Sequence, residues 1–255
     1  MPNRARPRAR NGRGGLPRLR PHLRLRPDQR GVHDVTVVLK LGGRVAVAEA
    51  TRALALRAAG EAVVVVHGAG PQITAELERR GIAPTFVDGR RVTTPEVLEV
   101  VRASLAEVNA AVCAAIGPDA VGLFGDEIGL RAAHLEALGL VGDPEPSAPV
   151  AVTAALAAGR IPVVAPLAEG PLNVNADEAA AALAVGLGAE RIEFVTDVAG
   201  VLVDGNIVGE LRADDASARL AAGVFEGGIV PKLVAAVRAA QGGVRATIGE
   251  TAVVA

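Results

Sequence analysis

The chain has 255 residues, half of them hydrophobic, and a formal net charge of −1. This length suffices for one large α/β domain or for two closely joined lobes. Its single cysteine, Cys113, excludes an intrachain disulfide framework, and the four histidines are too scattered to form a metal site. No apolar run approaches the roughly 18 residues of a membrane-spanning helix. We therefore expect a soluble, cytoplasmic protein that does not contact a membrane.

The first 34 residues differ in composition from the remainder. Residues 1–30 hold ten arginines and a single acid, Asp28, together with many prolines and glycines. Because this segment has no apolar block, we predict a disordered leader at 1–34, or sequence upstream of the natural start, rather than a signal peptide. The alternative is a basic arm for nucleic acid. The leader lacks aromatic residues for base stacking, so a nucleic-acid partner is not expected.

From Val35 onward, apolar runs that predict buried strands alternate with segments of helical spacing. The predicted strands are 35–39, 62–66, 120–124, 161–166, 192–196, 244–248 and 251–254. The predicted helices are 46–60, 71–81, 94–117, 152–159, 176–188, 214–222 and 231–241. A hairpin with Gly205-Asn206 at its turn is predicted at 201–208, and a hairpin plus a loop around 131–149. This alternation indicates a mainly parallel sheet covered on both faces, with ligands at the carboxyl ends of its strands.

Lys40 and Lys232 are the only lysines of the chain, although arginine is abundant. Both stand near glycines, which indicates positions that need a compact ammonium on a flexible stem. Lys40 opens the segment Lys40-Leu41-Gly42-Gly43 after the first predicted strand, where glycines let the backbone approach a phosphate closely. It is not a P-loop, because neither lysine is followed by Ser or Thr.

A second glycine-rich segment, 67–71 (HGAGP), follows the second predicted strand and leads into a helix. The free N–H groups of that helix could hold a transferring phosphoryl group. Ile73 stands where a dinucleotide-binding fingerprint needs its third glycine, and no serine lies in a GxSxG motif. Taken alone, the segment is equally consistent with a tight strand-to-helix turn. We interpret His67 as structural.

Four further segments follow or precede predicted elements at the same edge. The segment 89–93 (GRRVT) offers an arginine that could bind a carboxylate in a bidentate manner, although it could be an ordinary solvated pair. The segment 173–177 (NVNAD) offers two amides and an acid, although Asn175 could simply cap a helix. The segment 196–201 (TDVAGV) could frame a nucleotide base or ribose, and 227–232 (GGIVPK) places the second lysine at a helix start. Each segment is weak by itself, but their order is specific.

In this order, the segments KLGG, HGAGPQ, GRRVT, NVNAD, TDVAGV and GGIVPK resemble the acetylglutamate kinases of the amino acid kinase family. The resemblance covers residues 35–255. It implies an α/β fold, namely an open three-layer αβα sandwich with a mainly parallel central sheet, divided into an acyl-substrate lobe (35–170) and a nucleotide lobe (171–255). It also implies an enzyme that uses ATP and Mg²⁺ to phosphorylate the side-chain carboxylate of N-acetyl-L-glutamate, the second step of arginine biosynthesis, and that forms a homodimer.

The resemblance also implies residue roles. Lys40 and Lys232 would neutralise charge during phosphoryl transfer, and Asp177 would organise them. The substrate would be held by Gly68, Ala69, Arg91, Asn173 and Asn175. The nucleotide would be held by Gly42, Gly43, Gly70, Thr196, Asp197 and Gly200. No side chain is predicted as a metal ligand. A carboxylate acceptor needs no general base, because it is ionised at neutral pH, whereas the approach of two anions requires positive charge and N–H donors.

The chain departs from the family pattern at Ala69, in the part after Gly243, which is shorter than usual for the family, and in the N-terminal segment. Ala69 replaces the middle glycine of the family's HGGG, and Glu250-Thr251 stands where the family has a GT pair. The apolar N-terminal helix of arginine-inhibited members has no counterpart, so we expect a dimer without strong arginine feedback.

Three alternative functions remain at this point. The nearest is a kinase for carrier-protein-linked aminoadipate or glutamate, which tends to an SRYT-like segment in place of GRRVT. Carbamate kinase is the second alternative, although carbamate kinases are longer chains than this one. A catalytically silent sensor of nucleotide or amino acid would have no need of Lys40, Asp177 and Lys232.

Overall fold

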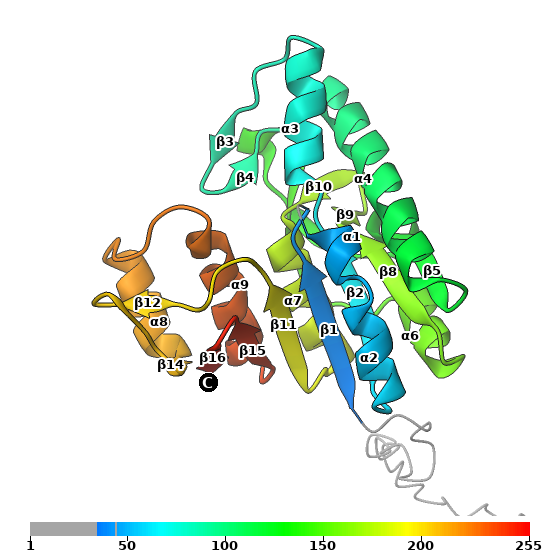
Figure 1. Cartoon of the computed structure of the whole chain (residues 1–255). Helices are drawn as coiled ribbons and strands as arrows, with labels where there is room; N and C mark the ends of the chain where they lie inside the picture. Colours follow the sequence, from blue (N-terminus) through cyan, green and yellow to red (C-terminus); the bar gives the residue numbers. More distant parts are fainter. Residues whose placement is uncertain (1–34, 44) are drawn as a thin grey trace, which may run out of the picture. The chain divides into compact units, whose positions relative to one another are not determined.

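The computed structural model describes residues 35–43 and 45–255, so the predicted leader at 1–34 lies outside the described residues. The main sheet has eight strands in the order β14-β16-β15-β11-β1-β2-β8-β5 (Figure 1). Their bounds are β1 Thr36–Leu41, β2 Ala62–His67, β5 Ala120–Phe124, β8 Ile161–Ala165, β11 Arg191–Val195, β14 Glu210–Arg212, β15 Arg245–Ile248 and β16 Thr251–Val254. The neighbouring strands pair in parallel except for β15 and β16, which are antiparallel. The predicted mainly parallel sheet is confirmed.

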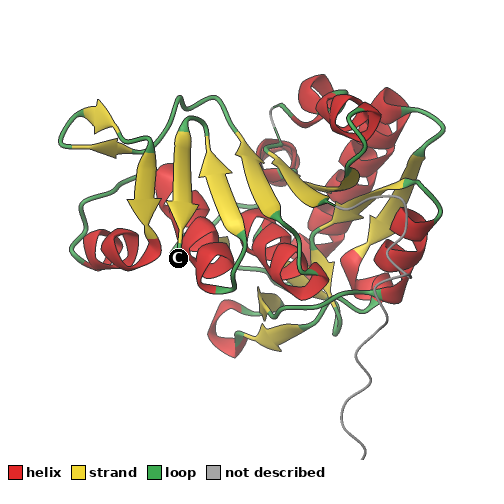
Figure 2. Ribbon diagram, turned by 90° about the horizontal axis from the view of Figure 1, so that it is seen from below, coloured by secondary structure: helices red, strands yellow, loops and turns green. Residues whose placement is uncertain are grey.

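Helices cover both faces of this sheet, because alternate side chains of its central strands point to opposite faces. Val37 and Leu39 of β1 are buried in one apolar cluster, and Val38 of the same strand is buried in another. The first cluster is formed with α1 (Ala46–Glu49), α2 (Arg52–Ala58), α3 (Gly70–Arg79) and α4 (Pro95–Ile116). The second is formed with α6 (Val150–Ala157), α7 (Ala176–Leu187), α8 (Ala213–Ala221) and α9 (Ile229–Gln241). Figure 2 shows these helices packed against the sheet, which confirms the three-layer αβα architecture.

Smaller β-elements form three sheets separate from the main sheet among the described residues. A second sheet has the order β6-β7-β10-β9, from Ala132–His134, Val141–Pro144, Leu172–Val174 and Leu167–Ala168. Two separate hairpins are β3–β4 (Phe86–Val87 and Arg90–Arg91) and β12–β13 (Leu202–Val203 and Asn206–Ile207). The short helices are α5 (Gly125–Ile128) and the 3₁₀ turn η2 (Glu136–Leu138). The predicted hairpin around 131–149 corresponds to the antiparallel pair β6–β7.

Two local predictions are wrong in detail. The helix predicted over 46–60 is divided into α1 and α2, because the N–H groups of Ala50, Ala53 and Leu54 bond to carbonyls three rather than four residues back. In the hairpin predicted at 201–208, the turn is Asp204-Gly205 rather than Gly205-Asn206. Both turn residues have positive φ, 50° and 80°, and this backbone matches the twist of the flanking strands.

Among the described residues, no helix has both the length and the apolarity that crossing a membrane would require.

Candidate active site

A cavity of about 430 Å³ lies at the carboxyl ends of β1, β2, β8 and β11, where the sequence predicted ligands to bind. It is bounded by the turns that follow these strands and by the N-terminal ends of α3 and α7. Thirteen of the fourteen predicted site residues line it: Lys40, Gly42, Gly43, Gly68, Ala69, Gly70, Arg91, Asn173, Asn175, Asp177, Thr196, Asp197 and Lys232. The fold thus brings together segments that are far apart in the sequence.

The remaining predicted residue, Gly200, lines a second cavity of about 470 Å³. The walls of this second cavity are mainly apolar, and they come from the segments 198–207 and 224–229. The two cavities adjoin each other in sequence at two places, 197–198 and 228–229. Asp197 lines the first and Val198 the second, while Gly228 lines the first and Ile229 the second.

The glycine turns after β1 and β2 pack directly against each other. A Cβ atom on Gly43 would lie 3.1 Å from the carbonyl oxygen of Gly68 and 3.1 Å from Pro71 Cδ. Gln72 Nε2 donates a hydrogen bond to the Gly43 carbonyl at 2.8 Å and fixes this turn against α3. The close approach of the two backbones explains why glycine is needed at position 43.

Ala69 precedes α3, and its methyl group requires no unusual backbone. Its φ is −138° and its ψ is 24°, so an L-residue fits without the strain of a left-handed conformation. Pro71 occupies the first turn of the helix, where no N–H donor is lost from the helical pattern. The N-terminal end of α3 therefore faces the cavity with free N–H groups despite the substitution.

A charged centre lies between the two glycine turns and α9. Asp177 is buried at the start of α7, and its Oδ1 atom is 2.7 Å from Lys40 Nζ. This contact is an ion pair rather than an aligned hydrogen bond. Asp177 Oδ2 is 3.9 Å from Lys232 Nζ. One carboxylate thus holds both lysines of the chain at one wall of the cavity, where their charge faces any anion that enters.

Lys232 is held in a partly dehydrated environment. Burial lowers the pKa of its ammonium from the usual 10.5, and the nearby charge of Lys40 lowers it further. The carboxylates of Asp177 and Asp197 act in the opposite direction. The pKa of Lys232 therefore depends on the balance of these charges, which is typical of groups in functional sites.

Arg91 of β4 presents a buried guanidinium to the same cavity. Its Nη2 atom donates to Thr74 Oγ1 at 2.8 Å and to the Gly70 carbonyl at 3.3 Å, and its Cζ atom lies 4.6 Å from the centre of the Phe86 ring. Its Nη1 atom is buried and has no hydrogen-bond partner within 35–43 and 45–255. A buried cationic donor without a partner is costly, and a bound carboxylate would satisfy it.

The two asparagines of the NVNAD segment take different positions. Asn173 Nδ2 donates to Thr93 Oγ1 at 3.0 Å, so its amide is oriented at the cavity wall. Asn175 is the N-cap of α7, and its Oδ1 accepts from the N–H groups of Asp177 at 2.8 Å and Glu178 at 3.3 Å. Asn175 therefore fixes the backbone that carries Asp177.

His67 is fully buried at the end of β2, and it is not among the residues that line the cavity. Its Nε2 atom lies 3.0 Å from Asn109 Nδ2, whose protons make the imidazole the acceptor. Burial lowers the pKa of His67 to about 4, so the ring is neutral at pH 7. This environment agrees with the structural interpretation of His67.

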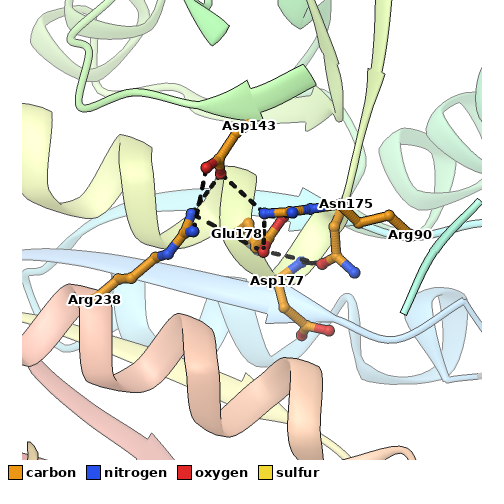
Figure 3. A network of polar contacts seen from close by, with 6 residues as sticks. All are labelled: Arg90, Asp143, Asn175, Asp177, Glu178 and Arg238. Carbon is orange, nitrogen blue, oxygen red and sulfur yellow. Dashed lines mark hydrogen bonds and ion pairs between the residues drawn. The ribbon is translucent and has the colours of Figure 1, made fainter. Parts of the chain in front are cut away.

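Sequence reasoning missed a group of charged residues beside the site (Figure 3). Arg90 of β4, Asp143 of β7, Glu178 of α7 and Arg238 of α9 form a network of ion pairs, which we call the arginine–carboxylate quartet. The sequence offered only one signal, the Arg90-Arg91 pair. Arg90 and Glu178 are 88 positions apart, so no local spacing could link them.

Known proteins resemble this chain over most of its length. A sequence profile of the amino acid kinase family matches residues 35–250. An acetylglutamate kinase from Saccharopolyspora erythraea is 44% identical over 239 residues, which cover 83% of this chain and 78% of that protein. An acetylglutamate kinase from Clavibacter sepedonicus is 47% identical over 241 residues, which cover 83% of this chain and 79% of that protein.

A solved structure shares the architecture. Carbamate kinase from Giardia lamblia bound to AMP-PNP superimposes with a TM-score of 0.67 at 17% identity, covering 88% of this chain and 99% of that one. At this identity the likeness concerns the fold alone. Because the family profile and the two relatives each span most of the described chain, the protein belongs to the amino acid kinase family and is an ATP-using kinase.

Proposed function

We propose that this kinase transfers the γ-phosphoryl group of ATP to the side-chain carboxylate of N-acetyl-L-glutamate, the second step of arginine biosynthesis. The observation that carries the proposal is the Lys40–Asp177–Lys232 centre, where two cations share one carboxylate beside two glycine turns. The name of the relatives, which are 44% and 47% identical over most of their length, supports the choice of substrate.

The chemistry requires charge compensation rather than a base. A carboxylate oxygen attacks the γ-phosphorus, the bond from that phosphorus to the bridging oxygen breaks, and the electron pair leaves on the β-phosphate of ADP. The acceptor is ionised at neutral pH, so no proton has to be removed. Lys40 and Lys232 would neutralise the oxygens that gain charge, and Asp177 would hold the two lysines in place. His67 is buried and neutral and takes no part.

We assign the acyl substrate to the side of the cavity formed by the 35–170 part of the chain. Arg91 would bind the α-carboxylate of the substrate through its unpartnered Nη1 atom and Nη2. Asn173 and Asn175 would contact the substrate from the opposite wall. The N–H groups at Gly68 and Ala69 would face the phosphoryl group as it is transferred.

We assign the base and ribose of the nucleotide to the 171–255 part, with its phosphates reaching Gly42, Gly43 and Gly70 of the 35–170 part. The base would enter the second, apolar cavity, which begins where the first one ends. Asp197 and Gly200 would then lie along the path from phosphate to base. Mg²⁺ would enter on the ATP phosphates, since in such sites it keeps several waters and few protein ligands.

We also propose that the enzyme is a cytoplasmic homodimer, as the resemblance implies. The single cysteine, Cys113, leaves the chain without an internal disulfide, as is usual for proteins of a reducing compartment. Size-exclusion chromatography with light scattering measures the mass, and a monomer would refute the dimer.

A substrate panel tests the proposed acceptor. With ATP and Mg²⁺, N-acetyl-L-glutamate should yield an acyl phosphate that hydroxylamine traps as a hydroxamate. Free glutamate and N-acetylaminoadipate should react at least about tenfold more slowly in kcat/KM, because one charge or one methylene is misplaced. A preference for N-acetylaminoadipate, or activity only with a carrier-linked acceptor, would contradict the proposal. No turnover by a folded, ATP-binding protein would favour the silent sensor.

A further inference from the structure

Arg90 makes the most extensive contacts of the arginine–carboxylate quartet. Its Nε atom donates to Glu178 Oε2 at 3.0 Å, and its Nη2 atom donates to Glu178 Oε1 at 2.8 Å and to Asp143 Oδ1 at 3.1 Å. The side chains of Arg90 and Glu178 are only 18% and 8% exposed. A bidentate pair with this little solvent is stronger and more specific in its geometry than a surface ion pair.

Two members of the quartet are adjacent in sequence to residues of the proposed active site. Arg90 precedes Arg91, the proposed ligand of the substrate carboxylate, and Glu178 follows Asp177, which holds the two lysines. Figure 3 shows Glu178 inside the quartet, while the carboxylate of Asp177 is directed away from it. The Arg90–Glu178 contact therefore ties the chain at Arg91 to the chain at Asp177, although neither of those two side chains belongs to it.

The hairpin that carries Arg90 and Arg91 is fixed at its base by Thr93, whose backbone bonds to Leu138 and Leu140 and whose hydroxyl donates to the Arg91 carbonyl at 2.7 Å. Beyond this base, strands β3 and β4 have two residues each and form their own sheet, and such a hairpin is marginally stable without further contacts. The side chains of the first strand, Phe86 and Val87, are 52% and 43% exposed. The side-chain contacts of Arg90 and Arg91 therefore add to the base in holding the hairpin over the cavity.

The second arginine of the quartet, Arg238, contacts both of its carboxylates. Arg238 Nη1 lies 2.5 Å from Asp143 Oδ1 and 3.9 Å from Glu178 Oε1. Since Arg238 is on α9, the helix whose first turn carries Lys232, the quartet is anchored on the body of the protein. With two arginines and two acids it is also electrically balanced, which lowers the cost of its partial burial.

We propose that Arg90 is a positioning residue for the acyl substrate. Through Glu178 it holds the β3–β4 hairpin over the cavity, so that Arg91 meets the substrate carboxylate. This inference rests on the proposed function. It assigns Arg90 to acceptor binding, and the nucleotide side of the site should not depend on it.

Direct contact between Arg90 and the substrate is the competing explanation, because Arg90 also lines the cavity. A substitution at Glu178 distinguishes these two explanations. If Arg90 acts through Glu178, removal of either partner should weaken acceptor binding, and removal of both should add little. If Arg90 binds substrate itself, Glu178→Gln should leave acceptor binding unchanged.

The experiment measures KM for N-acetyl-L-glutamate, KM for ATP and kcat in Arg90→Gln, Glu178→Gln and the double variant. We expect each single variant and the double variant to raise KM for the acceptor about tenfold, with KM for ATP and kcat within about threefold of wild type. Arg90→Lys, which keeps the charge but loses the bidentate geometry, should behave like Arg90→Gln and serves if that variant does not fold.

A matched control is available at the opposite end of the strands. Arg191 of β11 also pairs with two carboxylates, Glu61 at 2.7 Å and Glu193 at 2.9 Å, and its side chain is 23% exposed. Arg191→Gln should leave both KM values unchanged.

Three results would overturn the proposal: an unchanged acceptor KM, equal increases in both KM values, or additive effects in the double variant. If wild type forms no acyl phosphate, the proposed function fails. If wild type is active and the variants match it, only the role of Arg90 fails.

Discussion

Lys40 and Lys232 share Asp177 but differ in their surroundings. Lys40 Nζ lies 2.7 Å from Asp177 Oδ1, whereas Lys232 Nζ lies 3.9 Å from Asp177 Oδ2. The Lys232 side chain is 18% exposed. Burial lowers the pKa of Lys232. Loss of the proton from the Lys232 ammonium should therefore limit the reaction at high pH.

The pH profile of kcat/KM for ATP tests this role, because it reports the pKa values of the free enzyme. The charged form of Lys232 is the active one, so activity should be complete at neutral pH and should fall at a pH below 10.5 as the ammonium loses its proton. In Asp177→Asn the fall should begin at still lower pH, because the carboxylate raises the pKa of Lys232. Residual activity of Lys232→Arg should lack this fall, since arginine stays charged. A wild-type profile that is flat beyond pH 10.5 would refute the role.

Site residues that stand in short sequence motifs could be predicted from the sequence. The two lysines, the glycines and NVNAD stand beside predicted strand ends, and the structure places them around one cavity. Glu178 and Asp143 had no such signal. They contact Arg90 only because β4, β7 and α7 meet in space, across 53 and 88 positions of sequence.

Seven of the eight strands of the main sheet could be predicted because they are short apolar runs, and the central strands β1, β2 and β8 are buried on both faces. The remaining strand, β14, was not predicted, because its three residues are Glu210, Leu211 and Arg212 and only the leucine is buried. Strands β9 and β10, with two and three residues, could not be predicted either, since runs this short have no measurable period. The hairpin β12–β13 was predicted, but its turn was displaced by one residue, because Asp204 takes the left-handed backbone that glycine usually occupies.

Gly200 lies where the β12–β13 hairpin packs against β16. A Cβ atom there would lie 2.6 Å from Ile207 Cγ2 and 2.9 Å from Thr251 Oγ1. Thr251 Oγ1 accepts from the N–H of Val201 at 2.8 Å and donates to the Val208 carbonyl at 2.6 Å. The Glu250-Thr251 pair therefore serves as the attachment of the 196–201 segment to β16.

Gly200→Ala should lower the free energy of unfolding by about 1–3 kcal/mol, because the added methyl group forces the hairpin away from Thr251. It should also raise KM for ATP more than KM for the acceptor, since Gly200 lines the proposed base cavity. Thermal unfolding and steady-state kinetics measure both. Gly209→Ala is the control, because no described atom lies within 4 Å of its Cβ position. Equal behaviour of the two variants would contradict the prediction.

At the scale of the whole molecule, stability should depend on pH through His67. The pKa of this buried ring is about 4 in the folded protein and 6.5 in the unfolded chain. Above pH 6.5 the ring is mostly neutral in both the folded and the unfolded chain, so His67 does not lower the stability there. Below that, the unfolded chain binds a proton that the folded protein does not, so stability falls by up to about 3 kcal/mol as the pH drops through 4.

Urea unfolding at pH 7 and pH 4.5 measures this difference. His67→Gln, which can still accept a hydrogen bond from Asn109, should lose less stability than wild type over the same range. An identical loss in both proteins would show that other groups cause it.

The Lys40–Asp177–Lys232 centre is the proposed site of phosphoryl transfer to N-acetyl-L-glutamate. The rate of hydroxamate formation with ATP, Mg²⁺ and N-acetyl-L-glutamate, measured in wild type and in Lys232→Met, tests this assignment. We predict steady turnover by wild type and a kcat lower by about 10²–10³ in Lys232→Met, the usual cost of losing one charge that stabilises the transition state. Equal rates in the two proteins would show that this centre does not catalyse the transfer, and no hydroxamate from a wild type that binds ATP would refute the proposed acceptor.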